Sequence, residues 1–256
     1  MARPSGPGSP RTAPVPPTRT DPAGATTRPS AGVGEDGAVT VDAVVFDLDG
    51  VIVDSEPVWE EVRRAYVAAR GGTWQPDTQR RLMGMSTGEW AEYLSGELGV
   101  DRSAEQVAVD VVEEMARRYA VRVPLIDDAD LVVRRLAARW PLGLASSSPT
   151  RLIDAALTAA DLTAEFRVTL STERTARGKP APDVYLAVAE RLGVDPARCA
   201  AVEDSSNGVR SAAAAGMRVI AVPHGSYPLD PDAAELAATV LSSVHDLTPE
   251  VVDRLG

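Results

Sequence analysis

The stretch "VVFDLDGVIVDSE" (residues 44–56) places two acidic side chains directly after an apolar, β-branched run. Such a run is typical of a buried strand, where an ionised carboxylate is costly. Residues i and i+2 of an extended chain point to the same side, so Asp47 and Asp49 would share one side of the strand end. Two carboxylates so close repel each other unless a cation lies between them or one stays protonated. Taken alone, the stretch is equally compatible with a solvated turn that Gly50 allows.

Four further apolar runs have the same character, namely "PLGLASS", "FRVTL", "CAAVED" and "MRVIAV". Helical patterns with plausible caps separate most of them. We expect these helices to begin at Ser148 with Pro149, at Pro182, and at Ser205 or Ser206, and two of them to end at Gly193 and Gly216. Strands that alternate with helices predict an α/β fold, with a Rossmann-like parallel sheet covered on both faces.

Residues 56–124 interrupt this alternation, because they contain helical patterns and no convincing strand. In one of these patterns, Ser103 and Gln106 match a capping box. We therefore predict an α-helical cap domain at 56–124, inserted after the first strand of an α/β core formed by residues 39–55 and 125–256. Residues 1–38 are rich in Pro, Gly, Ser and Thr with almost no large apolar side chain, which predicts a disordered tail.

The composition argues against several classes of partner. The formal net charge is −11 and no block of Lys or Arg occurs, so nucleic acid is not an expected partner. No apolar run approaches the ~20 residues that span a bilayer. The single cysteine, Cys199, cannot form an internal disulfide, which is typical of a cytoplasmic protein. We expect a soluble chain that is a monomer or a weak dimer.

Polar residues follow three of the other predicted strands. "GLASSSPT" presents Ser146 and Ser147 before a helix N-terminus, where free N–H groups favour an anion. "ARGKPAPD" presents Lys179 as a point charge for phosphate, and "AVEDSSNGV" ends in Glu203 and Asp204, oxygen donors that suit Mg²⁺. Alone, a plain helix cap, a solvated lysine or capping by Asp204 would explain them as well. Together they lie at one edge of a parallel sheet and predict a site for phosphate and metal.

The motifs "DLDGVIVDSEP", "LASSS", "GKPAPDVY" and "VEDSSNGVRSAAAAGM" occur in this order. They resemble the four motifs of the haloacid dehalogenase-like hydrolase superfamily, specifically its β-phosphoglucomutase-like and sugar-phosphatase branch, over residues 41–223. The resemblance implies that Asp47 is a nucleophile that forms an aspartyl-phosphate, and that Asp49 protonates the leaving group and then activates water. It also implies phosphate binding by Ser146, Ser147 and Lys179, and a Mg²⁺ ion held by Asp47, the backbone carbonyl of Asp49, Asp204 and Glu203.

The branch of the superfamily decides between two reactions. Its mutases hold a second phosphate with a histidine and an arginine of the cap, and Trp59 and Thr87 stand at the matching positions here. We therefore predict a Mg²⁺-dependent phosphatase that hydrolyses small phosphomonoesters such as sugar phosphates. A β-phosphoglucomutase-type mutase is the alternative. A catalytically inactive module that binds a phosphometabolite is a second alternative, but every catalytic position is filled.

The cap is expected to close over the cleft, exclude water and select the leaving group. The cap residues predicted to contact the substrate are Trp59, Gly84, Ser86, Thr87 and Trp90. For the two tryptophans, packing in the interior of the cap is the alternative.

Overall fold

The computed structural model describes residues 40–82, 85–223 and 228–256. Two predictions therefore lie outside the described residues, namely the disordered tail at 1–38 and the substrate contact of Gly84. No helix within the described ranges is both long enough and apolar enough to cross a membrane.

A parallel sheet forms the centre of the fold, and in the described residues it has six strands in the order β3-β2-β1-β4-β5-β6. The predicted α/β, Rossmann-like class is confirmed. Strand β1 lies between β2 and β4, so the chain leaves it toward one edge and later returns to its other side. Such a reversal creates a crevice at the carboxyl ends of the strands. The strands are β1 Ala43–Phe46, β2 Leu142–Ser146, β3 Phe166–Ser171, β4 Cys199–Glu203, β5 Arg218–Ala221 and β6 Ala237–Val240.

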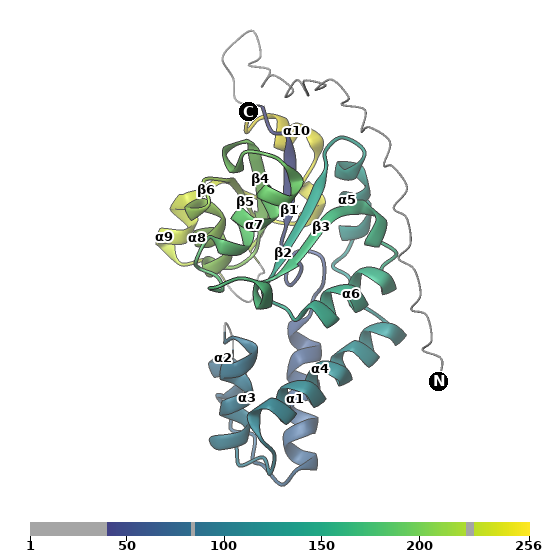
Figure 1. Ribbon diagram of the computed structural model, residues 1–256, viewed down its shortest axis with the longest axis vertical. Helices are drawn as coiled ribbons and strands as arrows, with labels where there is room; N and C mark the ends of the chain where they lie inside the picture. Colours follow the sequence, from purple (N-terminus) through teal and green to yellow (C-terminus); the bar gives the residue numbers. More distant parts are fainter. Residues whose placement is uncertain (1–39, 83–84, 224–227) are drawn as a thin grey trace, which may run out of the picture. The chain divides into compact units, whose positions relative to one another are not determined.

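Helices cover both faces of the sheet, because successive strand residues alternate between two apolar clusters. Val44 and Phe46 of β1 pack in the cluster that contains α5, α6 and α10. Ala43 and Val45 pack in the other cluster, with α7, α8 and α9 (Figure 1). The helices are α5 Ala129–Ala137, α6 Thr150–Ala159, α7 Asp183–Leu192, α8 Ser206–Ala214, α9 Pro231–Leu236 and α10 Pro249–Asp253.

A helical cap is inserted between β1 and α5, as predicted (Figure 1). Two crossing segments join it to the core, and they pair with each other. Val53 and Leu125 form an isolated antiparallel bridge, and the Asp54 amide donates to the Pro124 carbonyl at 2.8 Å. The exact domain boundaries, at 55/56 and 124/125, stay a prediction. The cap helices are α1 Glu56–Ala69, α2 Thr78–Leu82, α3 Thr87–Gly96 and α4 Ala104–Val121.

The helix after β2 does not begin as predicted. Helix α6 starts at Thr150 with Pro149 in the cap position, and Ser148 makes no capping hydrogen bond. The prediction that Ser148 caps this helix is therefore wrong, because its hydroxyl contacts an acidic side chain of the site instead. The ends of two other helices are confirmed. Gly193 closes α7 at φ +73°, and the Ser205 hydroxyl caps α8 by accepting from the Gly208 amide.

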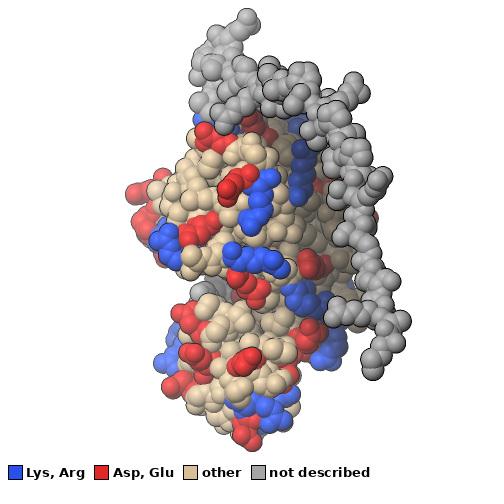
Figure 2. Space-filling view, in the orientation of Figure 1, with Lys and Arg blue, Asp and Glu red and all other residues tan. Residues whose placement is uncertain are grey.

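Charged side chains of both signs are interspersed over the visible face of the described residues (Figure 2). Most ion pairs here are surface pairs, such as Arg151 with Glu113, whose side chains are 57% and 50% exposed. Pairs of this kind contribute little to stability, at most about 1 kcal/mol each. Among the described residues, two acidic side chains are buried instead, namely Asp47 directly after β1 and Glu203 at the carboxyl end of β4.

Candidate active site

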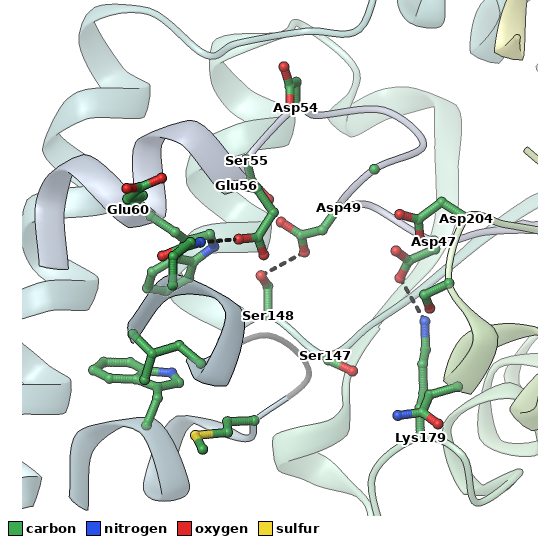
Figure 3. Close-up of a pocket in the computed structure, with 18 of the residues that line it drawn as sticks. Asp47, Asp49, Asp54, Ser55, Glu56, Glu60, Ser147, Ser148, Lys179 and Asp204 are labelled. Carbon is green, nitrogen blue, oxygen red and sulfur yellow. Dashed lines mark hydrogen bonds and ion pairs between the residues drawn. The ribbon is translucent and has the colours of Figure 1, made fainter. Parts of the chain in front are cut away.

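The carboxyl ends of β1, β2 and β4 border a cavity of about 710 Å³, which core and cap residues line together. Such a volume is typical of a small-molecule site. The core contributes Asp47, Asp49, Ser147, Ser148, Lys179 and Asp204 to the lining. Figure 3 shows Asp47, Lys179 and Asp204 on one side, with Asp49 and Ser148 next to them. The structure therefore brings together residues that the sequence predicted from four separate strand ends.

Asp47 and Lys179 form a buried ion pair on the core side of the cavity. The Lys179 Nζ donates to Asp47 Oδ1 at 2.7 Å, to Glu203 Oε1 at 2.6 Å and to the Ala145 carbonyl at 3.0 Å. All three hydrogens of the ammonium group thus have acceptors, which fixes its position. The second oxygen of Asp47 accepts no hydrogen bond from any described residue, and Asp47 lines the cavity.

The pKa values of this pair show that the site holds an excess of negative charge. Burial, with repulsion from Glu203 and Asp49, raises the pKa of Asp47 to about 8, although Lys179 opposes the shift. Burial alone would lower the pKa of Lys179, but the carboxylates of Asp47 and Glu203 outweigh it and raise that pKa above its usual range. Lys179 therefore stays charged at neutral pH, while the carboxylates lack sufficient positive charge nearby.

Two hydroxyl groups orient the carboxylate of Asp49. Ser148 Oγ donates to Asp49 Oδ2 at 2.7 Å (Figure 3). Ser146 Oγ lies 3.3 Å from the same oxygen. Oδ1 of Asp49 has no donor among the described residues. Ser146 is completely buried, whereas Ser147 is exposed and lines the cavity. Of the two serines predicted to bind phosphate, Ser147 is thus the one that the cavity reaches.

The acidic residues of the site fit a divalent cation. Asp47, Glu203 and Asp204 each offer a carboxylate oxygen, and these oxygens lie within 4.8 Å of one another. Burial, then repulsion from Glu203 and Asp47, raises the pKa of Asp204 well above its usual range. A cation between these groups would remove the repulsion, and an all-oxygen set is what Mg²⁺ prefers.

Glu203 differs from the other acids because donors already surround it. Its Oε1 accepts from Lys179 and from the Tyr185 hydroxyl at 2.7 Å. Its Oε2 accepts from the Asp204 amide at 3.1 Å and from the Ser205 hydroxyl at 3.3 Å. Glu203 therefore anchors Lys179 and the start of α8, and it is less available to a metal ion than Asp47 or Asp204.

The cap residues predicted to contact substrate divide into two groups. Trp59, Thr87 and Trp90 line the cavity. Both tryptophans are nonetheless buried, and their rings pack together at 5.8 Å between centroids. Ser86 has a structural role instead, since it caps α3 in a capping box with Glu89. Trp59 and Trp90 therefore pack in the interior of the cap and also line the cavity, whereas Ser86 stabilises the start of α3.

Among the cavity residues that were not predicted from the sequence, Ser148 and Arg63 are the two that matter most here. Ser148 contacts Asp49, and the signal was the third serine of "SSS", which was assigned to a helix cap. Arg63 lies on the buried face of α1 with Trp59, Val62 and Tyr66, where it lines the cavity. A charged residue on an otherwise apolar helix face was the signal that could have found it.

Comparison with known proteins agrees with this geometry. The family model described as "haloacid dehalogenase-like hydrolase" matches residues 41–216. Hexitol phosphatase B of Escherichia coli is 34% identical over 220 residues, which cover 84% of this chain and 96% of that protein. The phosphorylated carbohydrates phosphatase of Thermotoga maritima is 35% identical over 188 residues, or 72% and 86% of the two chains. The crystal structure of CbbY from Rhodobacter sphaeroides in complex with phosphate has a TM-score of 0.73 and 25% identity, and the match covers 84% of this chain and all of that one.

Proposed function

The chain belongs to the haloacid dehalogenase-like hydrolase family, and from this premise we propose that it is a Mg²⁺-dependent phosphatase of small phosphomonoesters, sugar phosphates in particular. The observation that carries the proposal is the arrangement around Asp47. Lys179 holds one of its oxygens, and the other has no donor among the described residues. Asp49 lines the same cavity and is oriented by Ser148. The phosphatase names of the relatives support the same reaction class.

In this mechanism Asp47 is the nucleophile. Its free oxygen attacks phosphorus, the bond from phosphorus to the leaving oxygen breaks, and an aspartyl-phosphate forms. Oδ1 of protonated Asp49 gives its proton to the leaving oxygen. Asp49 then takes a proton from water, which attacks the aspartyl-phosphate and releases inorganic phosphate with free Asp47. Ser148 keeps Asp49 in place through both steps because it holds Oδ2 and leaves Oδ1 free.

The exposed Ser147 would bind the phosphoryl oxygens together with Lys179, which would exchange one of its present acceptors for a phosphoryl oxygen. Ser146 would lie behind them. The charge of Lys179 stabilises the negative charge that these oxygens carry in the transition state. When bound, Mg²⁺ would be held by Asp47, the backbone carbonyl of Asp49 and Asp204, and it would neutralise phosphoryl and carboxylate charge. Glu203 would not bind the ion directly. It would contact the ion through water or support the site by holding Lys179.

The mutase alternative differs in the fate of the aspartyl-phosphate. A mutase has to protect this intermediate from water until the bound sugar has turned around. Trp59 and Thr87 occupy the positions where the mutases of this branch carry cationic residues, and neither side chain bears a charge. This favours hydrolysis. A binding module without turnover would bind phosphometabolites tightly and release no phosphate.

The test is phosphate release with Mg²⁺ across a panel of phosphorylated sugars, polyols and small acids, with β-glucose 1-phosphate included. We expect inorganic phosphate from several members. Glucose 6-phosphate formed from β-glucose 1-phosphate, with little free phosphate, would identify a mutase instead. Tight binding without either product would identify a binding module.

The first variant to test is Asp47→Asn, which keeps the size of the side chain and removes the nucleophile. We expect kcat to fall by at least about 10³-fold, with an unchanged circular dichroism spectrum. Asp42→Asn is the matched control. Asp42 precedes β1 at its other end, where it pairs with Arg198 at 2.7 Å, so its loss should leave kcat unchanged. Substantial turnover by Asp47→Asn would rule out the nucleophile assignment.

A further inference from the structure

Arg63 is a buried cation in the cavity wall, and no oppositely charged side chain among the described residues is in contact with it. Its side chain is on helix α1 and the residue is only 5% exposed. Its guanidinium makes no hydrogen bond or ion pair with any described residue, and its Nε is a buried donor without a partner. Buried polar groups are almost always satisfied, so an unsatisfied guanidinium beside a ligand cavity points to a partner that arrives with the ligand.

Two tryptophans hold this guanidinium in place. Its central carbon lies 4.3 Å from the centroid of the Trp59 ring and 4.9 Å from that of Trp90. Aromatic faces attract a cation but satisfy none of its N–H groups. Burial lowers the pKa of Arg63 to about 10, against the opposing effect of Glu56 and Asp49, so the group remains protonated at neutral pH. The cap therefore presents a fixed set of hydrogen-bond donors.

Several carboxylates and an amide oxygen lie in the same wall as Arg63. Asp54, Glu56 and Glu60 line the same cavity as Arg63 (Figure 3). Gln79 donates to Glu56 at 2.7 Å, and its own buried Oε1 finds no donor in the part of the chain that the structure describes. A leaving group with an additional negative charge would be repelled by these three carboxylates and attracted by only one guanidinium. Hydroxyl groups both donate and accept, so they satisfy Arg63 and the acceptors together.

We propose that Arg63 selects the leaving group by donating hydrogen bonds to the hydroxyls of an uncharged, polyhydroxylated leaving group, while Glu56 and Gln79 accept from its other hydroxyls. The proposal rests on the phosphatase function proposed above. It gives Trp59 and Trp90 the role of positioning Arg63 rather than contacting the substrate. It also gives the cap a polar contact with the leaving group, whereas the residues of the core act on the phosphoryl group.

The test compares Arg63→Met with the unaltered protein on two substrates. Glucitol 6-phosphate carries the expected leaving group, and acetyl phosphate has a leaving group too short to extend along the cap. We expect kcat/KM for glucitol 6-phosphate to fall by about 10- to 100-fold, the usual cost of leaving polar groups unpaired. The value for acetyl phosphate should stay the same. Equal values of the variant and the unaltered protein on glucitol 6-phosphate would overturn the proposal.

A third substrate separates hydroxyl recognition from anion recognition. 6-Phosphogluconate is as long as glucitol 6-phosphate and ends in a carboxylate. We expect the unaltered protein to prefer glucitol 6-phosphate. A preference for 6-phosphogluconate that Arg63→Met abolishes would make Arg63 an anion anchor and overturn the proposal. If the unaltered protein hydrolyses neither these substrates nor acetyl phosphate, the proposed function itself has failed.

Two further variants serve as controls. Arg63→Lys keeps the charge but loses the planar fork, so we expect an intermediate loss of kcat/KM on glucitol 6-phosphate. Arg80→Met makes the same change at an exposed arginine of α2, and it should leave kcat/KM unchanged for both substrates. Urea unfolding should show that Arg63→Met is as stable as the unaltered protein or more so, because methionine replaces an unpaired buried charge with an apolar chain of similar length.

Discussion

Two glycines give the acidic residues of the site the space that they need. Gly50 has φ +77°, and a Cβ atom on it would overlap the carboxylate of Asp204. A Cβ atom on Gly208 would overlap the carboxylate of Glu203 in the same way. The glycines of "DLDG" and "EDSSNG" are therefore required by the close approach of a charged side chain, in addition to the turn at Gly50.

Gly208→Ala should destabilise the protein through this overlap. Glu203 cannot move aside without losing Lys179, Tyr185 and Ser205 as donors. We expect a loss of about 2–4 kcal/mol in the free energy of unfolding, as for other overpacked or unpaired buried groups. Urea unfolding measures it.

Gly88→Ala is the matched control for this prediction. Gly88 also lies in the first turn of a helix, α3, and a Cβ atom there meets nothing within 4 Å. Because alanine is the better helix former, this change should be neutral or should stabilise by up to about 1 kcal/mol. Similar effects of the two substitutions would show that the carboxylate of Glu203 does not occupy the space beside Gly208.

Which site residues a sequence reveals depends on where their partners are. Asp47, Lys179 and Asp204 were predicted because they end or follow strands, and the ends of parallel strands meet at one edge. Arg63 was not predicted, because its guanidinium is held partly by Trp90. Trp90 is distant in the chain and approaches Arg63 only in the folded cap. The same holds for Ser148, whose choice between capping a helix and contacting Asp49 is decided by tertiary contacts.

At the scale of elements, the strands were predicted as far as burial marks them. Each of the five apolar runs overlaps one of the strands β1 to β5. Strand β6, Ala237–Val240, was missed because it is an edge strand whose residues alternate between half-buried and exposed. With two alanines and little apolar surface, "AATV" carries almost no periodic signal.

The helix caps show how neighbouring side chains compete for one hydrogen bond. The Ser103 hydroxyl does cap α4 by accepting from the Gln106 amide. The other half of the predicted capping box is absent, because the Gln106 side chain donates to Asp110 one turn later at 2.8 Å. A full box occurs at α3, where the Glu89 carboxylate accepts from the Ser86 amide at 2.7 Å. A carboxylate has no hydrogen to donate elsewhere, and its charge favours the helix N-terminus.

This difference predicts a pH dependence for Ser86→Ala. At pH 7 the substitution should cost about 1 kcal/mol in the free energy of unfolding, as for other helix caps. Hydrogen bonds from the Ser86 side chain and amide lower the pKa of Glu89 below its ordinary value of 4.5. Their stabilisation is therefore complete above that value and is lost as the pH falls through the lower pKa of the folded state. The cost of Ser86→Ala should shrink in the same range.

Ser103→Ala is the control for the pH dependence. It removes an equivalent cap, but its partner Gln106 does not titrate. Urea unfolding of both variants from pH 7 to below pH 4 should show a constant cost for Ser103→Ala. A constant cost for Ser86→Ala as well would mean that the charge of Glu89 contributes nothing to the box.

At the scale of the whole molecule, the fold brings several carboxylates together at a buried site, where charge is costly. The chain has a formal net charge of −11, and the surface intersperses both signs on the visible face (Figure 2). The carboxyl end of β1, in contrast, gathers Asp47, Asp49, Glu203 and Asp204 around Lys179. The raised pKa values of Asp47 and Asp204 show that this gathering opposes folding when no cation is bound. The site therefore lowers the stability of the whole protein for the sake of its chemistry.

Mg²⁺ should accordingly raise the melting temperature, by roughly 5–10 °C at a concentration about 100-fold above its dissociation constant. Asp204→Asn should have two opposite effects in the same thermal unfolding measurement. In EDTA it should melt higher than the unaltered protein, because burial and repulsion no longer disfavour a charge at this position. Adding Mg²⁺ should raise the melting temperature of this variant only slightly, because the Asp204 carboxylate is no longer there to bind the ion. Asp42→Asn, outside the site, should keep the full Mg²⁺ shift. An unchanged shift in Asp204→Asn would place the ion away from β4 and contradict the proposed ligand set.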